Sequence, residues 1–246
     1  MYHFFAEPSQ IQGTKIIITG NDVNHIKNVL RMKVGDEISV SNGIDEKEYR
    51  CGIEEFKEGE IICALRFIKE ADVELPSKIY LLQGIPKSDK MEVIIQKAVE
   101  LGVYEIIPVA AARSVVKFDE KKAQSRVERW QGIAQAAAKQ SKRALIPRIK
   151  GVMNMKDALV YVDSLDVKLI PYELSEDMGK TKQIIEEIKE GESVAVFIGP
   201  EGGFEVKEIE EAVAGGFIPV TLGKRILRTE TAGSTVLSWL MYHFEK

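Results

Sequence analysis

The segment from Ile198 to Phe204 reads I-G-P-E-G-G-F and places three glycines around one carboxylate, directly after an apolar stretch. Glycine lets a backbone approach a bound molecule closely, and proline stiffens the turn. No Lys-Ser or Lys-Thr pair follows the glycines, and their spacing differs from G-x-G-x-x-G, so the segment is neither a P-loop nor a dinucleotide fingerprint. The pattern suits a binding loop for another compact ligand, or a tight connection between a strand and a helix.

A second segment, from Leu222 to Gly233, reads L-G-K-R-I-L-R-T-E-T-A-G. It leads from a predicted strand through glycine to a predicted helix, for which Thr229 suits the N-cap position. Arg225 and Arg228 stand just before that helix, where their charges and the helix N-terminus would concentrate positive potential. The pattern indicates a site for an anionic group, although two solvated arginines would look the same in sequence.

Carboxylates and guanidinium groups in these segments are candidates for catalysis. Glu201 and Glu230 could accept a proton from a reacting group. Arg228 or Arg113 could stabilise an oxygen that becomes negative during a reaction. Glu230 has an alternative role, because an acidic residue in the first turn of a helix also stabilises the helix dipole.

The elements around both segments alternate between strand and helix. The predicted strands are 79–85, 105–109, 167–172, 193–198 and 217–222, and the predicted helices are 91–101, 123–143, 180–189, 205–214 and 230–244. Such alternation predicts a parallel sheet covered by helices on both faces. Ligands of open parallel sheets bind outside the carboxyl ends of the strands, which is where both segments begin.

The residues before Asp72 have a different pattern. Their predicted strands are 2–5, 15–19, 37–41, 49–56 and 61–68. One amphipathic helix is predicted from Asp22 to Met32, with Ile26 and Val29 on its packed face. We therefore expect a small β-barrel that carries one helix, followed by a linker around Pro76.

Composition narrows the class of protein. The chain has 246 residues and a hydrophobic fraction of 45%, which is enough for a substantial core. It contains no apolar run of membrane-spanning length and no signal-peptide pattern, so we expect a cytosolic protein without a membrane partner. Cys51 and Cys63 are too few for a disulfide framework, and both are predicted to be reduced side chains on strands.

Charge is distributed unevenly along the chain. The formal net charge is −4, but residues 113–150 contain eleven Lys or Arg against three acidic residues, a local charge of +8. A basic stripe on an acidic body suits a protein that holds phosphates along one face. The alternative is an ordinary solvated helix face.

Taken together, the two glycine-bearing segments resemble the signature of the RsmE family, the ribosomal RNA uridine-N3 methyltransferases within the SPOUT superfamily of knotted methyltransferases. The similarity spans the chain and includes His25 to Arg31, Lys97 to Val103 and Gln135 to Arg143. It implies an α/β fold, with a PUA-like β-barrel over residues 1–72 for RNA binding and a knotted (trefoil) methyltransferase domain with a parallel sheet over residues 73–246. It also implies S-adenosyl-L-methionine as cofactor, a uridine N3 of 16S ribosomal RNA in the small subunit as target, and a homodimer.

The resemblance and the charge pattern assign candidate site residues. Cofactor binding would use Gly199, Glu201, Gly202, Gly203, Leu222, Gly223, Ile226, Leu227, Arg228, Thr231 and Ala232. RNA binding would use His25, Arg31, Arg113, Arg126, Arg129, Lys139 and Arg143, and the catalytic candidates remain Arg228, Glu201 and Glu230. No metal site is expected.

Two alternatives stay open at this point. Related knotted enzymes methylate the ribose 2′-hydroxyl with similar cofactor loops, and a non-catalytic RNA-binding assembly factor could keep the barrel and the basic helix. Chemical identification of the methylated product would separate the first alternative. Failure to bind S-adenosylmethionine would favour the second.

Overall fold

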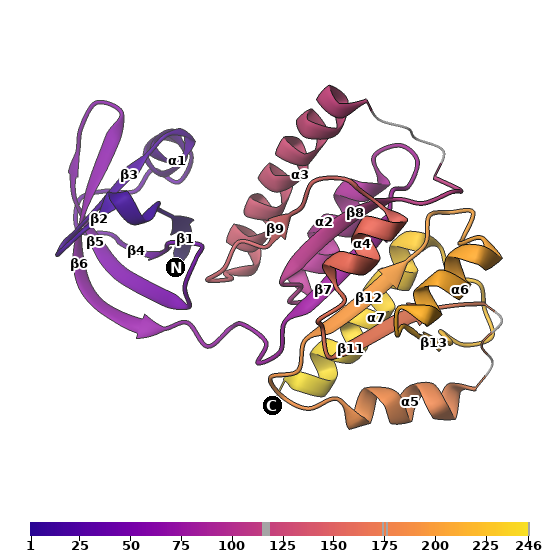
Figure 1. Cartoon of the computed structure of the whole chain (residues 1–246). Helices are drawn as coiled ribbons and strands as arrows, with labels where there is room; N and C mark the ends of the chain where they lie inside the picture. Colours follow the sequence, from indigo (N-terminus) through magenta and orange to yellow (C-terminus); the bar gives the residue numbers. More distant parts are fainter. Residues whose placement is uncertain (115–118, 174, 176, 246) are drawn as a thin grey trace. The chain divides into compact units, whose positions relative to one another are not determined.

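The computed structural model describes residues 1–114, 119–173, 175 and 177–245, and these group into two compact units (Figure 1). The first comprises Met1–Glu74 with Ala138–Ile146, and the second comprises Leu75–Ala137 with Pro147–Lys246. The domain bounds proposed from the sequence, 1–72 and 73–246, describe two continuous domains. The first unit of the structure is discontinuous, because it also includes Ala138–Ile146. Lys117, which contributes to the basic stripe, lies outside the described residues.

The first unit is built on one curled, six-stranded sheet. Its strands are β1 (Tyr2–Phe5), β2 (Ile11–Gln12), β3 (Lys15–Thr19), β4 (Glu37–Ser41), β5 (Lys47–Phe56) and β6 (Glu60–Glu70), in the order β1-β4-β5-β6-β3-β2. β1 and β4 are parallel and the other pairs antiparallel, and two irregularities in the β5–β6 register accompany the bend of these long strands (Figure 1). Cys51 and Cys63 are buried and free on β5 and β6, as predicted.

The predicted helix from Asp22 to Met32 is shorter than expected. It consists of α1 (Asn21–Asn24) and the π-turn η2 (His25–Val29). A separate 3₁₀ turn, η1 (Pro8–Gln10), lies earlier in the chain. Arg31 has a φ of 53°, a left-handed conformation that cannot continue a helix. The π-turn also changes the helix periodicity, so Ile26 is buried but Val29 is 61% exposed.

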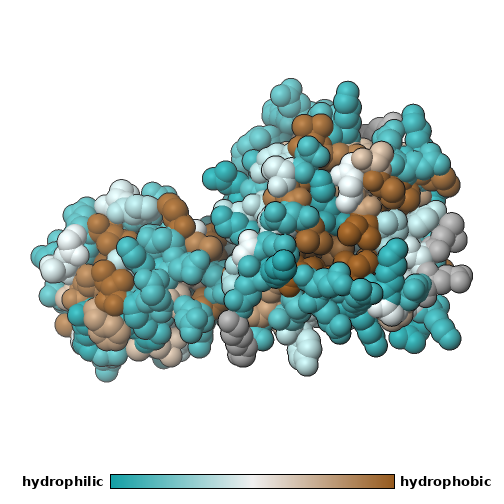
Figure 2. All heavy atoms as spheres, turned by 60° about the horizontal axis from the view of Figure 1, so that its bottom comes forward, coloured by the Kyte–Doolittle hydropathy of each residue, from teal (hydrophilic) through white to brown (hydrophobic). Residues whose placement is uncertain are grey.

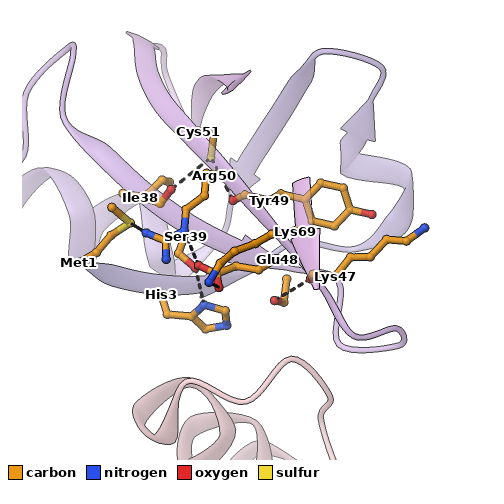
Figure 3. Close-up of polar contacts among 11 residues, drawn as sticks. Met1, His3, Ile38, Ser39, Lys47, Glu48, Tyr49, Arg50, Cys51 and Lys69 are labelled. Carbon is orange, nitrogen blue, oxygen red and sulfur yellow. Dashed lines mark hydrogen bonds and ion pairs between the residues drawn. The ribbon is translucent and has the colours of Figure 1, made fainter. Parts of the chain in front are cut away.

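A buried histidine connects β1 to a charged cluster on the same sheet (Figure 3). Ser39 Oγ donates to Glu48 Oε1 (2.7 Å), so the hydroxyl proton is used and His3 Nδ1 must donate to Ser39 Oγ (2.9 Å). Burial lowers the pKa of His3 below its ordinary value of 6.5, and the nearby charge of Glu48 and a hydrogen bond with the backbone of Arg143 only partly oppose this effect.

We expect His3 to make the stability of the protein depend on pH. As the pH falls below about 6.5, the unfolded histidine binds a proton that folded His3 still excludes, so the free energy of unfolding falls, by at most about 1.4 kcal/mol per pH unit from this residue. Urea unfolding between about pH 7.5 and 5.5 should therefore show a smaller loss for His3→Gln than for the wild type. His25→Gln, at a half-exposed histidine, is the matched control; equal losses in all three proteins would contradict the prediction.

The second unit contains the parallel sheet that the alternating pattern predicts (Figure 1). Its strands are β7 (Ile79–Gly84), β8 (Glu105–Ala110), β9 (Arg148–Ile149), β10 (Met153–Asn154), β11 (Val167–Pro171), β12 (Val194–Ile198) and β13 (Ile218–Val220). The order is β10-β8-β7-β12-β11-β13, with β9 also on β8, and every pair is parallel. The strands β9 and β10 have only two residues each, which is too short for a periodic sequence pattern to predict them.

Helices cover both faces of this sheet. They are α2 (Lys90–Glu100), α3 (Glu120–Ser141), α4 (Met155–Tyr161), α5 (Met178–Glu187), α6 (Val206–Ala214) and α7 (Thr229–Phe244). α4 and α6 share a buried apolar cluster with alternate residues of β7, β8 and β12, whereas α2 packs with α7, which also contacts β12. The predicted α/β fold is therefore confirmed, and the trefoil knot stays a prediction. Within the described part of the chain, no helix has the length and apolarity required to cross a bilayer.

Candidate active site

The two glycine-bearing segments meet at the carboxyl edge of the parallel sheet, although β11 lies between their strands, β12 and β13. They line a pocket of about 540 Å³, a volume typical of small-molecule sites. Of the predicted cofactor residues, those that line it are Gly199, Glu201, Gly202, Gly203, Leu222, Gly223, Ile226, Leu227, Arg228 and Ala232. Thr231, an exposed residue of α7, does not line the pocket, and neither does Glu230.

The first loop, Gly199–Phe204, is fixed by contacts from several elements. Thr229 Oγ1 donates to the carbonyl of Gly199 (2.6 Å), and Arg113 Nη1 donates to the carbonyl of Gly202 (2.9 Å). Gly203, with a φ of 65°, closes a turn by donating its N–H to the carbonyl of Pro200 (2.9 Å). These bonds tie the loop to α7 and to Arg113 and close its own turn.

Glu201 is held by the segment that begins α2. Its carboxylate accepts from the N–H of Lys87 (3.1 and 3.2 Å) and pairs with Lys90 Nζ (3.2 Å), which also lies 3.5 Å from Glu230. Burial raises the pKa of Glu201, but hydrogen bonds from its own N–H, Lys90 and Lys87 outweigh burial and hold it below the ordinary value. A carboxylate held in this way is a weak proton acceptor.

The second loop presents a mixture of apolar and cationic side chains. Ile226 is 89% exposed, and Leu222 and Leu227 are half-buried beside it. Arg228, rather than Thr229, is the N-cap residue of α7; Thr229 is buried in the first turn, where its hydroxyl reaches Gly199. Among the described residues, no side-chain hydrogen bond or ion pair engages the exposed Arg228, so its guanidinium is available to a ligand.

Two of the residues assigned to RNA binding have internal partners instead. Arg143 is buried, its guanidinium bonds to Glu74 (3.1 Å from Nε to Oε2), and the same carboxylate accepts from the N–H groups of Ala144 and Leu145. Lys139 pairs with Asp22 and lies over the ring of Phe4, 4.3 Å from its centroid. Both side chains, Lys139 near the end of α3 and Arg143 just beyond it, are therefore engaged within the first unit, and their assignment to RNA binding stays a prediction.

The other predicted RNA contacts differ in their surroundings. Arg129 is largely exposed but bonds to Glu92 (2.6 Å), and Arg126 is half-buried on the same helix. His25 is half-buried and Arg31 exposed in the first unit. Arg113 lines the pocket, so the structure brings it to the cofactor loops rather than leaving it on a separate surface.

Several residues of the site lack a sequence pattern that could reveal them. Pro171 ends β11, Tyr172 and Glu173 follow it, and the three complete one wall of the pocket, which Lys90 reaches from α2. The rule that ligands bind beyond the carboxyl ends of strands could have indicated the residues after β11. Lys90 could not have been found in this way, because its role depends on packing between distant segments. No cluster of three metal-ligating side chains is found among the residues that the structure describes.

Comparisons with known proteins agree with this architecture. A family model described as an RNA methyltransferase domain matches residues 73–241, and a model described as an RNA methyltransferase PUA domain matches residues 18–65. Ribosomal RNA small subunit methyltransferase E of Bacillus subtilis is 39% identical, over 100% of this chain and 98% of its own length.

Two similar solved structures contain the cofactor. A methyltransferase E from Neisseria gonorrhoeae bound to S-adenosyl methionine has a TM-score of 0.85 at 30% identity, covering 98% of this chain and 97% of its own. A protein from Legionella pneumophila, described as a methyltransferase in complex with SAM, has a TM-score of 0.86 at 32% identity, covering 98% and 96%. With both domains matched in order and the whole chain aligned to these relatives, the protein belongs to the ribosomal RNA small subunit methyltransferase E family of RNA methyltransferases.

Proposed function

We propose that the protein is an S-adenosylmethionine-dependent methyltransferase that modifies N3 of a specific uridine in 16S ribosomal RNA. The observation that carries the proposal is the pocket at the sheet edge, in which both glycine-bearing loops of this family meet and are joined by the Thr229–Gly199 hydrogen bond. The full-length similarity to proteins named for small-subunit ribosomal RNA supports the substrate class.

The residues of the pocket suit S-adenosylmethionine. The apolar side chains of Leu222, Ile226 and Leu227 offer flat contact area for adenine, and the backbone groups around Gly199 and Gly223 can bond to polar edges. When bound, the cofactor supplies an electrophilic methyl group. The protein must then orient the acceptor nitrogen in line with that group and keep water away.

Uracil N3 carries a proton and becomes nucleophilic only when that proton is released, here to solvent water, since no side chain is assigned to accept it. The negative charge then spreads onto O2 and O4, so a hydrogen-bond donor next to either oxygen lowers the barrier. Arg228 is the residue best suited to this role, because its guanidinium is free at the N-terminus of α7. Glu201 holds the loop through Lys87 and Lys90, and Glu230 shares Lys90; we assign both to positioning rather than to proton transfer.

RNA binding would use the PUA domain and the cations of α3 that belong to the second unit, among them the half-buried Arg126 and the largely exposed Arg129. We expect the double charge reversal Arg126→Glu/Arg129→Glu to reduce the slope of log affinity against log salt by about 1.4, since each lost phosphate contact on a single strand contributes about 0.7. Filter binding of 16S ribosomal RNA over a salt series measures the slope. The matched control, Lys182→Glu/Lys207→Glu, removes two exposed lysines of α5 and α6. An unchanged slope in the α3 variant would argue against this surface.

A homodimer in the cytosol remains part of the proposal. Figure 2 shows hydrophobic residues gathered in patches on the surface of the larger body. Independently of that view, Ile226 and Tyr242 are large side chains that are 89% and 85% exposed. Exposed apolar area of this kind is typical of an interface between subunits. Sedimentation velocity tests the proposal, and a monomer at all concentrations would contradict it.

The decisive experiment is identification of the methylated nucleoside. The protein is incubated with labelled S-adenosylmethionine and either naked 16S ribosomal RNA or whole small subunits from a strain that lacks the enzyme. Methylation at N3 blocks base pairing and stops reverse transcriptase at one position. A product that resists alkaline cleavage would identify a 2′-O-methyltransferase instead, and absence of cofactor binding would favour a non-catalytic assembly factor.

A further inference from the structure

Gln83 links three elements of the second unit although it does not line the pocket. This residue of β7 is fully buried. Its Nε2 donates to the carbonyl of Gly84 (2.9 Å) and to Thr229 Oγ1 (2.9 Å), and Thr229 donates onward to the carbonyl of Gly199 (2.6 Å). One chain of hydrogen bonds thus joins β7, the first turn of α7 and the loop after β12.

The direction of this chain follows from donor and acceptor chemistry. The carbonyl of Gly199 can only accept, so the single proton of the Thr229 hydroxyl is used there and the hydroxyl oxygen must accept from Gln83. The carbonyl of Gly84 can also only accept, which uses the second proton of the Gln83 amide. The Gly199–Pro200 peptide has no N–H, so its carbonyl is the one polar group through which that peptide can be held.

This arrangement leaves the other end of the Gln83 amide unsatisfied. Its Oε1 is buried with no hydrogen-bond partner among the described residues, which destabilises the folded state. A side chain of similar size without that oxygen would avoid the cost. The presence of an amide at this position is therefore better explained by the two groups that its N–H donors bind, the carbonyl of Gly84 and the hydroxyl of Thr229, than by packing within the sheet.

We infer that Gln83 and Thr229 are positioning residues, which lock the carbonyl of Gly199 and so join the two halves of the cofactor pocket before the cofactor binds. The inference rests on the proposed S-adenosylmethionine site. Gln83 reaches the loop after β12 only through Thr229, and Thr229, which also lines the pocket, reaches it through the carbonyl of Gly199. Their joint effect is on the affinity of the pocket, because a loop released from α7 must be ordered again on binding.

Calorimetric titration of S-adenosylmethionine into matched variants tests the inference. Gln83→Met and Thr229→Val keep side-chain size but remove the donors, and each should raise the Kd about tenfold. Thr229→Ser keeps the hydroxyl and should stay within about twofold of the wild type. The double variant Gln83→Met/Thr229→Val should bind no more weakly than Thr229→Val alone, since the two residues act in series.

The variant Gln83→Glu, which replaces the amide donor with a titratable carboxyl, adds a second readout, the pH dependence of affinity. A general loss of stability would not produce this dependence. The buried carboxyl introduced by Gln83→Glu can donate to Thr229 only when protonated, and burial favours the protonated form. Its affinity for S-adenosylmethionine should therefore improve on lowering the pH from about 8 to about 6 relative to the wild type.

The outcomes separate this inference from the proposed function. Wild-type protein that fails to bind S-adenosylmethionine would overturn the function. Wild-type binding together with unchanged affinity in Gln83→Met and Thr229→Val would overturn the inference alone. Additive losses in the double variant, or equal losses in Thr229→Ser and Thr229→Val, would also overturn it.

Discussion

Replacing Arg228 with alanine is expected to lower kcat about 100-fold or more, because it removes a donor from an oxygen that gains charge in the transition state. The Kd for S-adenosylmethionine should change by less than about threefold. Arg228 is exposed at the N-terminus of α7, lines the pocket and has no internal side-chain partner among the described residues. Single-turnover methylation and calorimetry measure the two quantities separately.

The conservative variant Arg228→Lys sharpens this test. Lysine keeps the positive charge but lacks the planar fork that can bond to an oxygen and a neighbouring group together, so it should restore only part of the rate. Equal losses in kcat and in cofactor affinity for Arg228→Ala would instead assign Arg228 to cofactor binding.

Gly84→Ala is expected to weaken S-adenosylmethionine binding about tenfold to 100-fold through strain in the first loop. A Cβ atom on Gly84 would lie 2.5 Å from Pro200 Cδ and 2.6 Å from Pro200 N, and backbone atoms cannot yield as a flexible side chain does. The Gly199–Phe204 loop must therefore move away from β7. Calorimetry measures the affinity, and a thermal melt verifies that the variant is folded.

Gly132→Ala is the matched control for this substitution. Gly132 lies in α3, where an added Cβ would meet nothing within 4 Å, and alanine favours helix. This variant should bind the cofactor like the wild type. Wild-type affinity in Gly84→Ala would show that the loop tolerates displacement and would contradict the preformed site.

The sequence predicted those parts of the site that depend on local backbone chemistry. Glycines at the ends of predicted strands placed both loops at the carboxyl edge of the sheet, because strand periodicity and glycine patterns are local properties. The roles of Gln83 and Lys90 could not be predicted from the sequence, since each residue contacts another more than a hundred positions away in the chain. Family resemblance supplied the identity of the cofactor, which residue types alone left open.

The pattern of charged residues in the sequence predicted the structure less well than the pattern of glycines. The basic stripe predicted a phosphate-binding face, but Arg143 and Lys139 neutralise Glu74 and Asp22, which belong to a distant part of the sequence. Composition counts charges without their partners, so it cannot separate a buried ion pair from an exposed cation. The early end of the helix at Arg31 has a similar origin, since a single left-handed residue leaves no trace in hydrophobic periodicity.

The discontinuous first unit has a consequence for synthesis on the ribosome. Because Ala138–Ile146 completes this unit, residues 1–74 leave the ribosome well before their last packing partners are made. Until then the carboxylate of Glu74 lacks Arg143 and the N–H groups of Ala144 and Leu145 that satisfy it when buried. The N-terminal domain therefore reaches its final structure only after half of the chain has been translated, in departure from the usual order in which the first domain folds first.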